Sequence, residues 1–202
     1  MAAPAPSPSP SRAVDAREKL LVAGTRLVAQ QGIDAINTNV IARAARVGVG
    51  TFYSHFDDKH ALHRAVVARG LEVVRRALAD AHGRVEDRPV AEQVRAGVQA
   101  LVDVAAERPD LFKAAFSRPA ATGARRAGAI GLSPRPVEQR LRALQAEDEI
   151  DARIDPAVAA RAFIEMQVAI VCWWLDEPAR PDRDALVETL VRMHPAIACR
   201  AA

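Results

Sequence analysis

Residues 33–60 constrain the fold and the function of this chain more than any other stretch, because they predict two short helices joined by a tight turn. Asn37 is a residue type favoured just before the first turn of a helix, and the apolar residues after it recur at helical spacing. The pattern breaks at residues 46–48 and resumes over residues 49–56. About eight helical residues, a turn of three or four and about seven more residues form a helix-turn-helix arrangement.

The charge of this stretch favours contact with a nucleic acid. Residues 35–56 contain no Asp or Glu, whereas Arg43 and Arg46 supply positive charge. A surface that approaches DNA phosphates cannot carry carboxylates without repulsion. Phe52 and Phe56 are four residues apart and are expected to point into the core, which leaves the other side chains of the second helix outside. On spacing and charge alone, an acid-poor helical hairpin without a partner remains an open alternative.

The stretch resembles the DNA-binding signature of the TetR family of bacterial transcriptional regulators, most strongly over residues 15–70. The matching positions are Asn37, Ile41, Ala42, Ala45, Val47, Gly50, Thr51, Phe52, Tyr53, His55, Phe56 and Lys59. Two positions depart from the signature, because Arg46 replaces the turn glycine and Gly48 replaces the serine that caps the second helix. A left-handed backbone at residue 46 would cost roughly 1–2 kcal/mol. Gly48 is a weaker N-cap than serine.

The predicted DNA contacts follow from the outward-facing positions and from the resemblance. Thr51 is expected to hydrogen-bond a base edge, and Val49 to pack on a thymine methyl group. The resemblance implies that Tyr53 and Lys59 contact the DNA backbone, and Lys59 also lies at the start of a predicted helix, where free amides bind phosphate. The predicted DNA-binding residues are Asn37, Thr38, Arg43, Arg46, Gly48, Val49, Gly50, Thr51, Tyr53, Ser54, His55 and Lys59.

The remainder of the chain predicts an all-α protein of about nine helices, since half of its residues are hydrophobic, only 4% are aromatic and strand signals are sparse. We expect a disordered tail over residues 1–13, rich in Pro and Ser, and a three-helix DNA-binding domain over residues 14–60. A helical domain for ligand binding and dimerisation is expected over residues 61–202. The helices predicted from residue 59 onward span residues 59–81, 90–107, 111–117, 137–147, 155–175 and 182–194.

Charge and cysteine usage bound the setting in which the protein works. The chain has 28 Lys and Arg against 25 Asp and Glu, so its basic character is mild. Residues 1–13 lack the apolar core of a signal peptide. Cys172 and Cys199 are far apart in a chain without export signals, which favours free thiols in a reducing compartment. We therefore expect a cytoplasmic protein.

The predicted helix at residues 155–175 is apolar on two sides, so it must be buried on two sides. It is not expected to cross a membrane, because Arg161 and Glu165 leave only about half of the ~20 uncharged residues that a span needs. One side is expected to face a second copy of the chain, although a central core helix in a monomer remains an alternative. The resemblance implies that the last two long helices form a four-helix dimer interface. Its predicted residues are Ile164, Val168, Val171, Leu175, Leu186 and Leu190.

A dimer would present two reading helices to successive major grooves, so its operator would be palindromic double-stranded DNA. Residues 90–175 are then expected to hold a pocket for an unknown small-molecule effector. The predicted lining is Phe112, Phe116, Phe163, Met166, Trp173 and Trp174, residue types that an ordinary core also needs. The resemblance implies that ligand binding moves the helix that begins near residue 59 and releases a repressor from DNA.

No motif supports an enzyme, a cofactor or a metal site. Cys172 and His194 lack the context of a catalytic pair, and Ser54 and His55 are adjacent on one helix and face different ways. The histidines near residue 60 match no known metal-ligand spacing and have no Cys nearby. A helical interaction protein without DNA binding is the alternative function. Salt-dependent binding to a palindromic duplex would distinguish the two.

Overall fold

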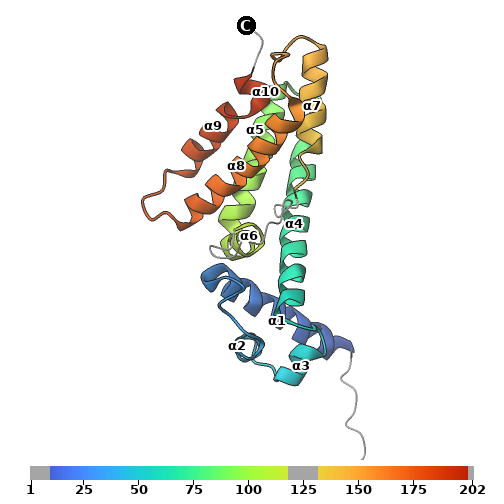
Figure 1. The fold of residues 1–202 in the computed structure, drawn as a ribbon, viewed down its shortest axis with the longest axis vertical. Helices are drawn as coiled ribbons and strands as arrows, with labels where there is room; N and C mark the ends of the chain where they lie inside the picture. Colours follow the sequence, from blue (N-terminus) through green and yellow to red (C-terminus); the bar gives the residue numbers. More distant parts are fainter. Residues whose placement is uncertain (1–9, 118–131, 200–202) are drawn as a thin grey trace, which may run out of the picture.

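The computed structural model describes residues 10–117 and 132–199, and the regular elements within those ranges are all α-helices (Figure 1). This confirms the all-α fold. The helices are α1 (Pro10–Gln31), α2 (Thr38–Ala44), α3 (Val49–Tyr53), α4 (Lys59–Gly83), α5 (Val90–Glu107), α6 (Pro109–Phe116), α7 (Arg135–Ala146), α8 (Pro156–Asp176), α9 (Arg183–Arg192) and α10 (Pro195–Ala198). Two differences from the sequence expectation are the early start of α1, at Pro10, and the four-residue α10. The first nine residues of the predicted tail, and most of the predicted connection over residues 118–136, lie outside the described residues.

The helices enclose two hydrophobic cores that share α4. The smaller core lies among α1, α2, α3 and the first half of α4, and Leu62 and Val66 are fully buried there. The larger core lies among the second half of α4 and α5 to α10, and Val74 belongs to it. In Figure 1, α2 and α3 lie at one end of the molecule, α7 and α10 lie at the other, and α4 runs between the two ends. Any movement of α4 therefore acts on both cores.

Helix α4 packs very closely against α6 where the two cores meet. A Cβ atom added at Gly70 would lie 2.5 Å from the Cβ atom of Ala115, so only glycine allows this approach. Leu111 and Ala114, also on α6, reach into the smaller core. Helix α6 thus holds α4 at its middle.

Short polar side chains cap the start of several helices, and Asn37 has the capping role that the sequence predicts. Asn37 accepts a hydrogen bond from the Val40 amide at 3.0 Å, and Asp58 accepts one from the Ala61 amide at 2.6 Å. Asp155 accepts from the amides of Ala157 and Val158, both at 2.9 Å. These bonds satisfy amides that have no partner within the helix.

The turn between α2 and α3 places a non-glycine residue in the left-handed region. Arg46 has a φ of 56°. Its amide donates to the Arg43 carbonyl oxygen at 3.0 Å, and the Val47 amide donates to the Ala42 carbonyl oxygen at 3.0 Å. This pair of bonds is the Schellman ending of a helix, in which the left-handed position is usually glycine. Gly48 then caps α3 without a side-chain hydrogen bond.

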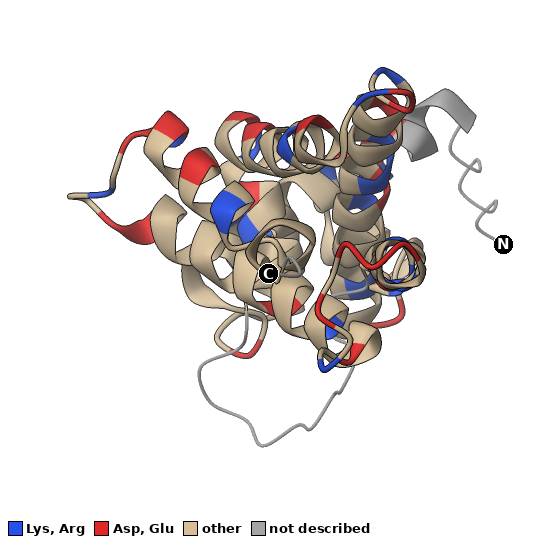
Figure 2. Cartoon of the chain, turned by 90° about the horizontal axis from the view of Figure 1, so that it is seen from above, with Lys and Arg blue, Asp and Glu red and all other residues tan. Residues whose placement is uncertain are grey.

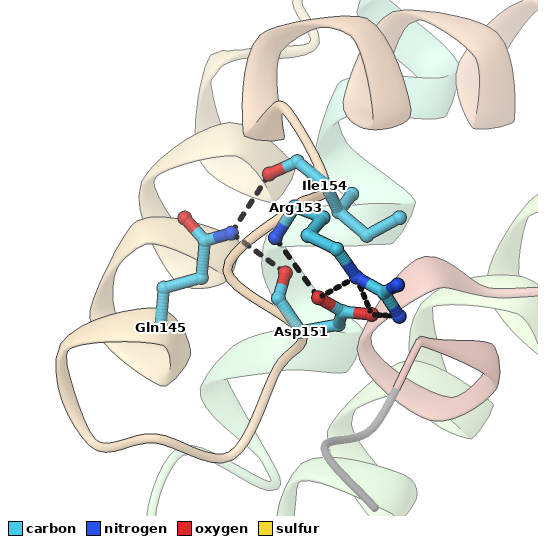
Figure 3. A network of polar contacts seen from close by, with 4 residues as sticks. All are labelled: Gln145, Asp151, Arg153 and Ile154. Atoms are coloured by element: carbon cyan, nitrogen blue, oxygen red, sulfur yellow. Dashed lines mark hydrogen bonds and ion pairs between the residues drawn. The ribbon is translucent and has the colours of Figure 1, made fainter.

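A compact polar network fixes the connection between α7 and α8 (Figure 3). The Gln145 amide nitrogen donates to the carbonyl oxygens of Asp151 and Ile154, at 3.1 and 2.8 Å. The Arg153 guanidinium binds the Asp151 carboxylate at 2.6 Å, and these bonds lower the pKa of Asp151 to about 2. The network sets the chain direction just before α8.

Charged residues of both signs are interspersed over the helices, as the view from the end opposite α2 and α3 shows (Figure 2). Some of them form ion pairs between helices. Arg69 of α4 binds Glu18 of α1 at 2.6 Å, and Arg95 of α5 binds Glu188 of α9 at 2.6 Å. Exposed pairs of this kind contribute little to stability. These ion pairs help to orient the helices, whose packing is determined by the two hydrophobic cores.

Helix α8 is long and apolar enough to cross a membrane by length and composition alone. In this fold it acts as a core helix instead. Phe163, Val168 and Val171 are buried in the larger core. The long apolar composition of α8 therefore has an explanation within the bundle.

Replacing Arg46 with glycine is expected to stabilise the free protein by about 1 kcal/mol, because glycine adopts a positive φ without steric cost. Denaturant unfolding measures this change. The control is Arg43→Gly, which removes a neighbouring arginine from inside α2 and should destabilise by a similar amount. Equal destabilisation by both substitutions would contradict the strain at residue 46.

His194 generates a pH dependence of stability, because its ring is buried and its pKa is lowered to about 4 by desolvation. At a pH below 6.5, the usual pKa of histidine, His194 binds a proton in the unfolded chain but not in the folded protein. The free energy of unfolding should therefore fall by up to ~3 kcal/mol as the pH drops from 6.5 to about 4. His194→Asn, which can still cap α10, should lose this part of the pH dependence, whereas the exposed-site control His60→Asn should keep it. Identical pH profiles for the wild type and His194→Asn would contradict this account.

Candidate functional site

Helix α3 presents one side to the smaller core and the other to solvent. Phe52 is fully buried and Phe56 is nearly so, with their ring centroids 5.8 Å apart, as the spacing predicts. Val49 and Tyr53 are exposed, at 38% and 55% of their surface, and Thr51 is partly exposed. The short helix therefore offers a mixed apolar and hydroxyl-bearing surface to a partner.

Tyr53 links the two helices of the hairpin on this outer side. Its hydroxyl oxygen lies 3.3 Å from the Thr38 hydroxyl oxygen at the start of α2. Its ring packs edge-on against Phe52, with centroids 5.5 Å apart. Two predicted DNA-binding hydroxyl groups are thereby brought together. The hydroxyl group of Ser54 donates to the Gly50 carbonyl oxygen at 3.0 Å and is engaged within the same short segment.

The predicted cationic residues fall into two groups. Arg43 and Arg46 are exposed near the α2–α3 turn. Lys59 instead turns inward, where its ammonium group donates to the carbonyl oxygens of Asp34 and Ile36, at 3.2 and 3.0 Å. It holds the segment before α2 against the start of α4, a structural role that no pattern in the sequence indicates.

The start of α4 also differs from the expected phosphate site. The Asp58 carboxylate caps the helix by accepting from the Ala61 amide, and Asp57 and Asp58 are both exposed. These carboxylates occupy and oppose the place where an anion would bind. Asn37, likewise exposed, uses its side-chain oxygen to cap α2. The other predicted residues of this region are Gly48, Gly50 and Ser54, which are exposed, and His55, which is partly exposed.

The histidines near residue 60 do not form a metal site in the part of the chain that the structure describes, where no group of three or more His, Cys, Asp or Glu converges. His63 is partly buried, with its Nε2 atom 3.3 Å from the Ala114 carbonyl oxygen. Burial lowers the pKa of His63. The His63 ring therefore contributes to the packing of α4 against α6.

A cavity of about 540 Å³ opens in the larger core, with walls from α4, α5, α7 and α8. Of the six residues predicted to line a pocket, Phe163 alone is among its lining residues. Phe112 is buried elsewhere in the core, Met166 is partly buried there, and Trp174 is held by a 2.7 Å hydrogen bond from its Nε1 atom to the Pro181 carbonyl oxygen. The structure corrects the predicted lining, because most of these large apolar side chains fill the core.

Phe116 and Trp173 line a different hollow of about 430 Å³, which lies along α8. The cavity of about 540 Å³ is also lined by Gln167 and His194, two polar residues that were not predicted from the sequence as part of a pocket. One signal could have found Gln167. It lies four residues after Phe163 and four before Val171, so it interrupts an apolar face with an amide.

The predicted dimer residues also need correction. Ile164, Val168, Val171, Leu186 and Leu190 are all buried within the single chain, and Leu175 is partly buried. Their side chains fill the protomer's own core and are not free to meet a second copy.

The face of α8 that points to solvent lies opposite these buried residues. It carries an exposed apolar stripe at helical spacing, formed by Val158, Ala162, Ala169 and Trp173. Val158 and Trp173 expose 67% and 51% of their surface. Apolar side chains of this size that remain exposed in one row are typical of an interaction surface.

Comparison with known proteins agrees with this architecture. Residues 20–66 match the family model described as "Bacterial regulatory proteins, tetR family". This segment contains α2, α3 and their supports from α1 and α4. No curated protein matches the chain.

Solved structures resemble the whole chain in fold. The fatty acid degradation regulator FadR from Bacillus halodurans has a TM-score of 0.70 at 16% identity, covering 96% of this chain and 100% of that one. A tetR-family regulatory protein from Rhodococcus RHA1 has a TM-score of 0.74 at 19% identity, covering 93% and 98%. AibR, solved with isovaleryl coenzyme A and operator DNA, has a TM-score of 0.70 at 20% identity, covering 90% and 98%. Residues 20–66 thus match the model of the tetR family, and the chain has the fold of these solved structures.

Proposed function

We propose that this protein is a cytoplasmic homodimeric repressor that binds a palindromic operator through α3 and leaves it when a small molecule occupies the cavity. The observation that carries the proposal is the exposed side of α3, flanked by Arg43 and Arg46 and free of Asp and Glu throughout residues 35–56. Phosphate contacts require positive or neutral donors, and this surface supplies them.

The proposed DNA contacts divide into two kinds. Arg43, Arg46 and the hydroxyl groups of Thr38 and Tyr53 position the protein on phosphates. Thr51 and Val49 contact base edges, because they are accessible side chains of the α3 surface. The remaining predicted residues, Asn37, Gly48, Gly50, Ser54, His55 and Lys59, support this surface, and Lys59 acts by holding the segment in front of α2.

Ligand control is proposed to act through α4. Leu78 and Ala79 of α4 line the cavity, and the same helix packs at its other end against α1 and follows directly on α3. A ligand that fits one position of α4 better than another changes the population of DNA-binding dimers. AibR, which was solved with both a coenzyme A ester and operator DNA, supports the idea that a chain of this fold binds both kinds of partner.

The dimer is proposed to form through the exposed stripe of α8, which would bury Val158, Ala162, Ala169 and Trp173 against a second copy.

A helical interaction protein that binds no DNA is the alternative function. It is less well supported, because it leaves the match over residues 20–66 and the acid-free hairpin without a purpose.

Arg43→Ala should weaken binding to operator and to unrelated DNA alike, and should lower the slope of log affinity against log salt by about 0.9 for each phosphate that the protein no longer neutralises. Fluorescence anisotropy over a salt series measures this, with a duplex that the wild-type protein enriches from a random library. Arg84→Ala removes the same charge just after the far end of α4 and serves as the matched control. An unchanged slope in Arg43→Ala would contradict the phosphate role, and failure to enrich any duplex would favour the alternative function.

Ala169→Glu should convert the dimer to a monomer and weaken operator binding, because it places a charge inside the proposed interface. Light scattering at a concentration where the wild type is dimeric measures the mass. Ala143→Glu, at an exposed position of α7, is the control and should remain dimeric. A persistent Ala169→Glu dimer would move the interface away from α8.

A further inference from the structure

Gln167 and His194 are the two polar side chains that are buried in the part of the chain that the structure describes, with exposures of 7% and 8%. Both line the cavity of about 540 Å³. Phe163 connects them, because the His194 ring packs edge-on against it with centroids 4.5 Å apart and Gln167 follows it by one helical turn on α8. The two polar groups therefore belong to one part of the cavity wall.

The hydrogen bonding of His194 determines which of its nitrogens carries a proton. Its Nδ1 atom accepts from the Ala196 amide at 3.1 Å, so that nitrogen has no hydrogen. Burial lowers the pKa of His194 to about 4, and the ring is neutral near neutral pH. A neutral imidazole with an accepting Nδ1 carries its hydrogen on Nε2. His194 thus offers one N–H donor whose position is fixed by the start of α10 and by Phe163.

The Gln167 amide has no hydrogen-bond partner among the described residues. Among the described residues, every side-chain nitrogen or oxygen that is fully buried has a hydrogen-bond partner. The unpaired amide atoms of Gln167 are therefore not fully buried, and the accessible space beside them is the cavity that Gln167 lines. A buried amide without a partner is costly, and such groups are normally satisfied by water or by a ligand. Gln167 therefore provides a second donor that a bound molecule can use.

The wall near this polar pair is mostly apolar and includes Val94, Val98 and Ile164. Apolar walls with a few fixed polar groups are typical of small-molecule sites. Arg75, Arg140 and His82 also line the cavity, and all three are exposed. His82 is the second cause, after burial, of the lowered pKa of His194. A carboxylate held by the buried pair would give up its hydration with no buried charged partner among the described lining residues, whereas a neutral carbonyl oxygen needs only the two hydrogen bonds.

We propose that the effector is a mainly apolar molecule whose neutral carbonyl oxygen accepts hydrogen bonds from His194 Nε2 and from the Gln167 amide. The inference rests on the proposed role of this cavity as the effector site and adds the chemical class that the site recognises. The apolar body fills the space beside the valines of α5, and the carbonyl oxygen fixes its orientation.

Benzophenone and 1,1-diphenylethylene, in which a methylene group replaces the carbonyl oxygen, test this directly, because the two molecules have nearly the same shape and differ in the acceptor oxygen. Calorimetric titration of the full-length protein should give about tenfold tighter binding of the ketone. Gln167→Leu and His194→Asn should each reduce the preference to about threefold or less. Val137→Leu alters an apolar residue of the same wall and is the control, in which the preference should persist.

Equal affinity of the two probes for the wild type, failure of both to bind, or a preference that survives in both variants would overturn the inference. DNA release is measured separately with the same probes. A ketone preference without release of DNA would support the carbonyl site and contradict ligand control of DNA binding. Release by both probes with equal affinity would support ligand control and contradict the carbonyl site.

Discussion

Helix α4 belongs to two hydrophobic cores, and the rest of the molecule depends on that sharing. Leu62 and Val66 are buried with the hairpin, whereas Val74 is buried with the larger bundle. Gly70, at the boundary, lies too close to Ala115 for any side chain to intervene. Because packed cores resist compression, the helix cannot shift at one end without repacking at the other. The cavity and the exposed hairpin are therefore connected through one continuous element of 25 residues.

The hairpin itself is shaped by two unusual local solutions. Arg46 takes the left-handed position that glycine normally fills, which places its cationic side chain in the turn at some cost in backbone strain. Lys59 directs its ammonium group to two backbone carbonyl groups and ties the start of α4 to the segment before α2. Both residues keep α2 and α3 in a fixed relation, so that the outward side of α3 is presented as a rigid surface.

Much of this architecture could be predicted from sequence, because it depends on local patterns. The helix over residues 90–107, the cap at Asn37 and the inward phenylalanines of the hairpin all follow from periodicity and capping chemistry. The orientation of α8 could not be predicted in this way. A helix that is apolar on two sides does not reveal which side meets its own core, because the choice depends on packing by α5, α6 and α7.

The lining of the cavity could not be predicted from the sequence for the same reason. The cavity is the space that large core residues leave between helices, and its polar wall is assembled from Gln167 on α8 and His194 before α10.

The proposal that two copies of α3 enter one face of a DNA duplex is tested most directly by hydroxyl-radical footprinting, which reports protection of the backbone at each nucleotide. A dimer that inserts both copies of α3 should give two protected patches of equal strength on one face of the DNA, with centres one helical turn, ~34–36 Å, apart. A single protected patch, or a duplex left uniformly cleaved at saturating protein, would contradict it.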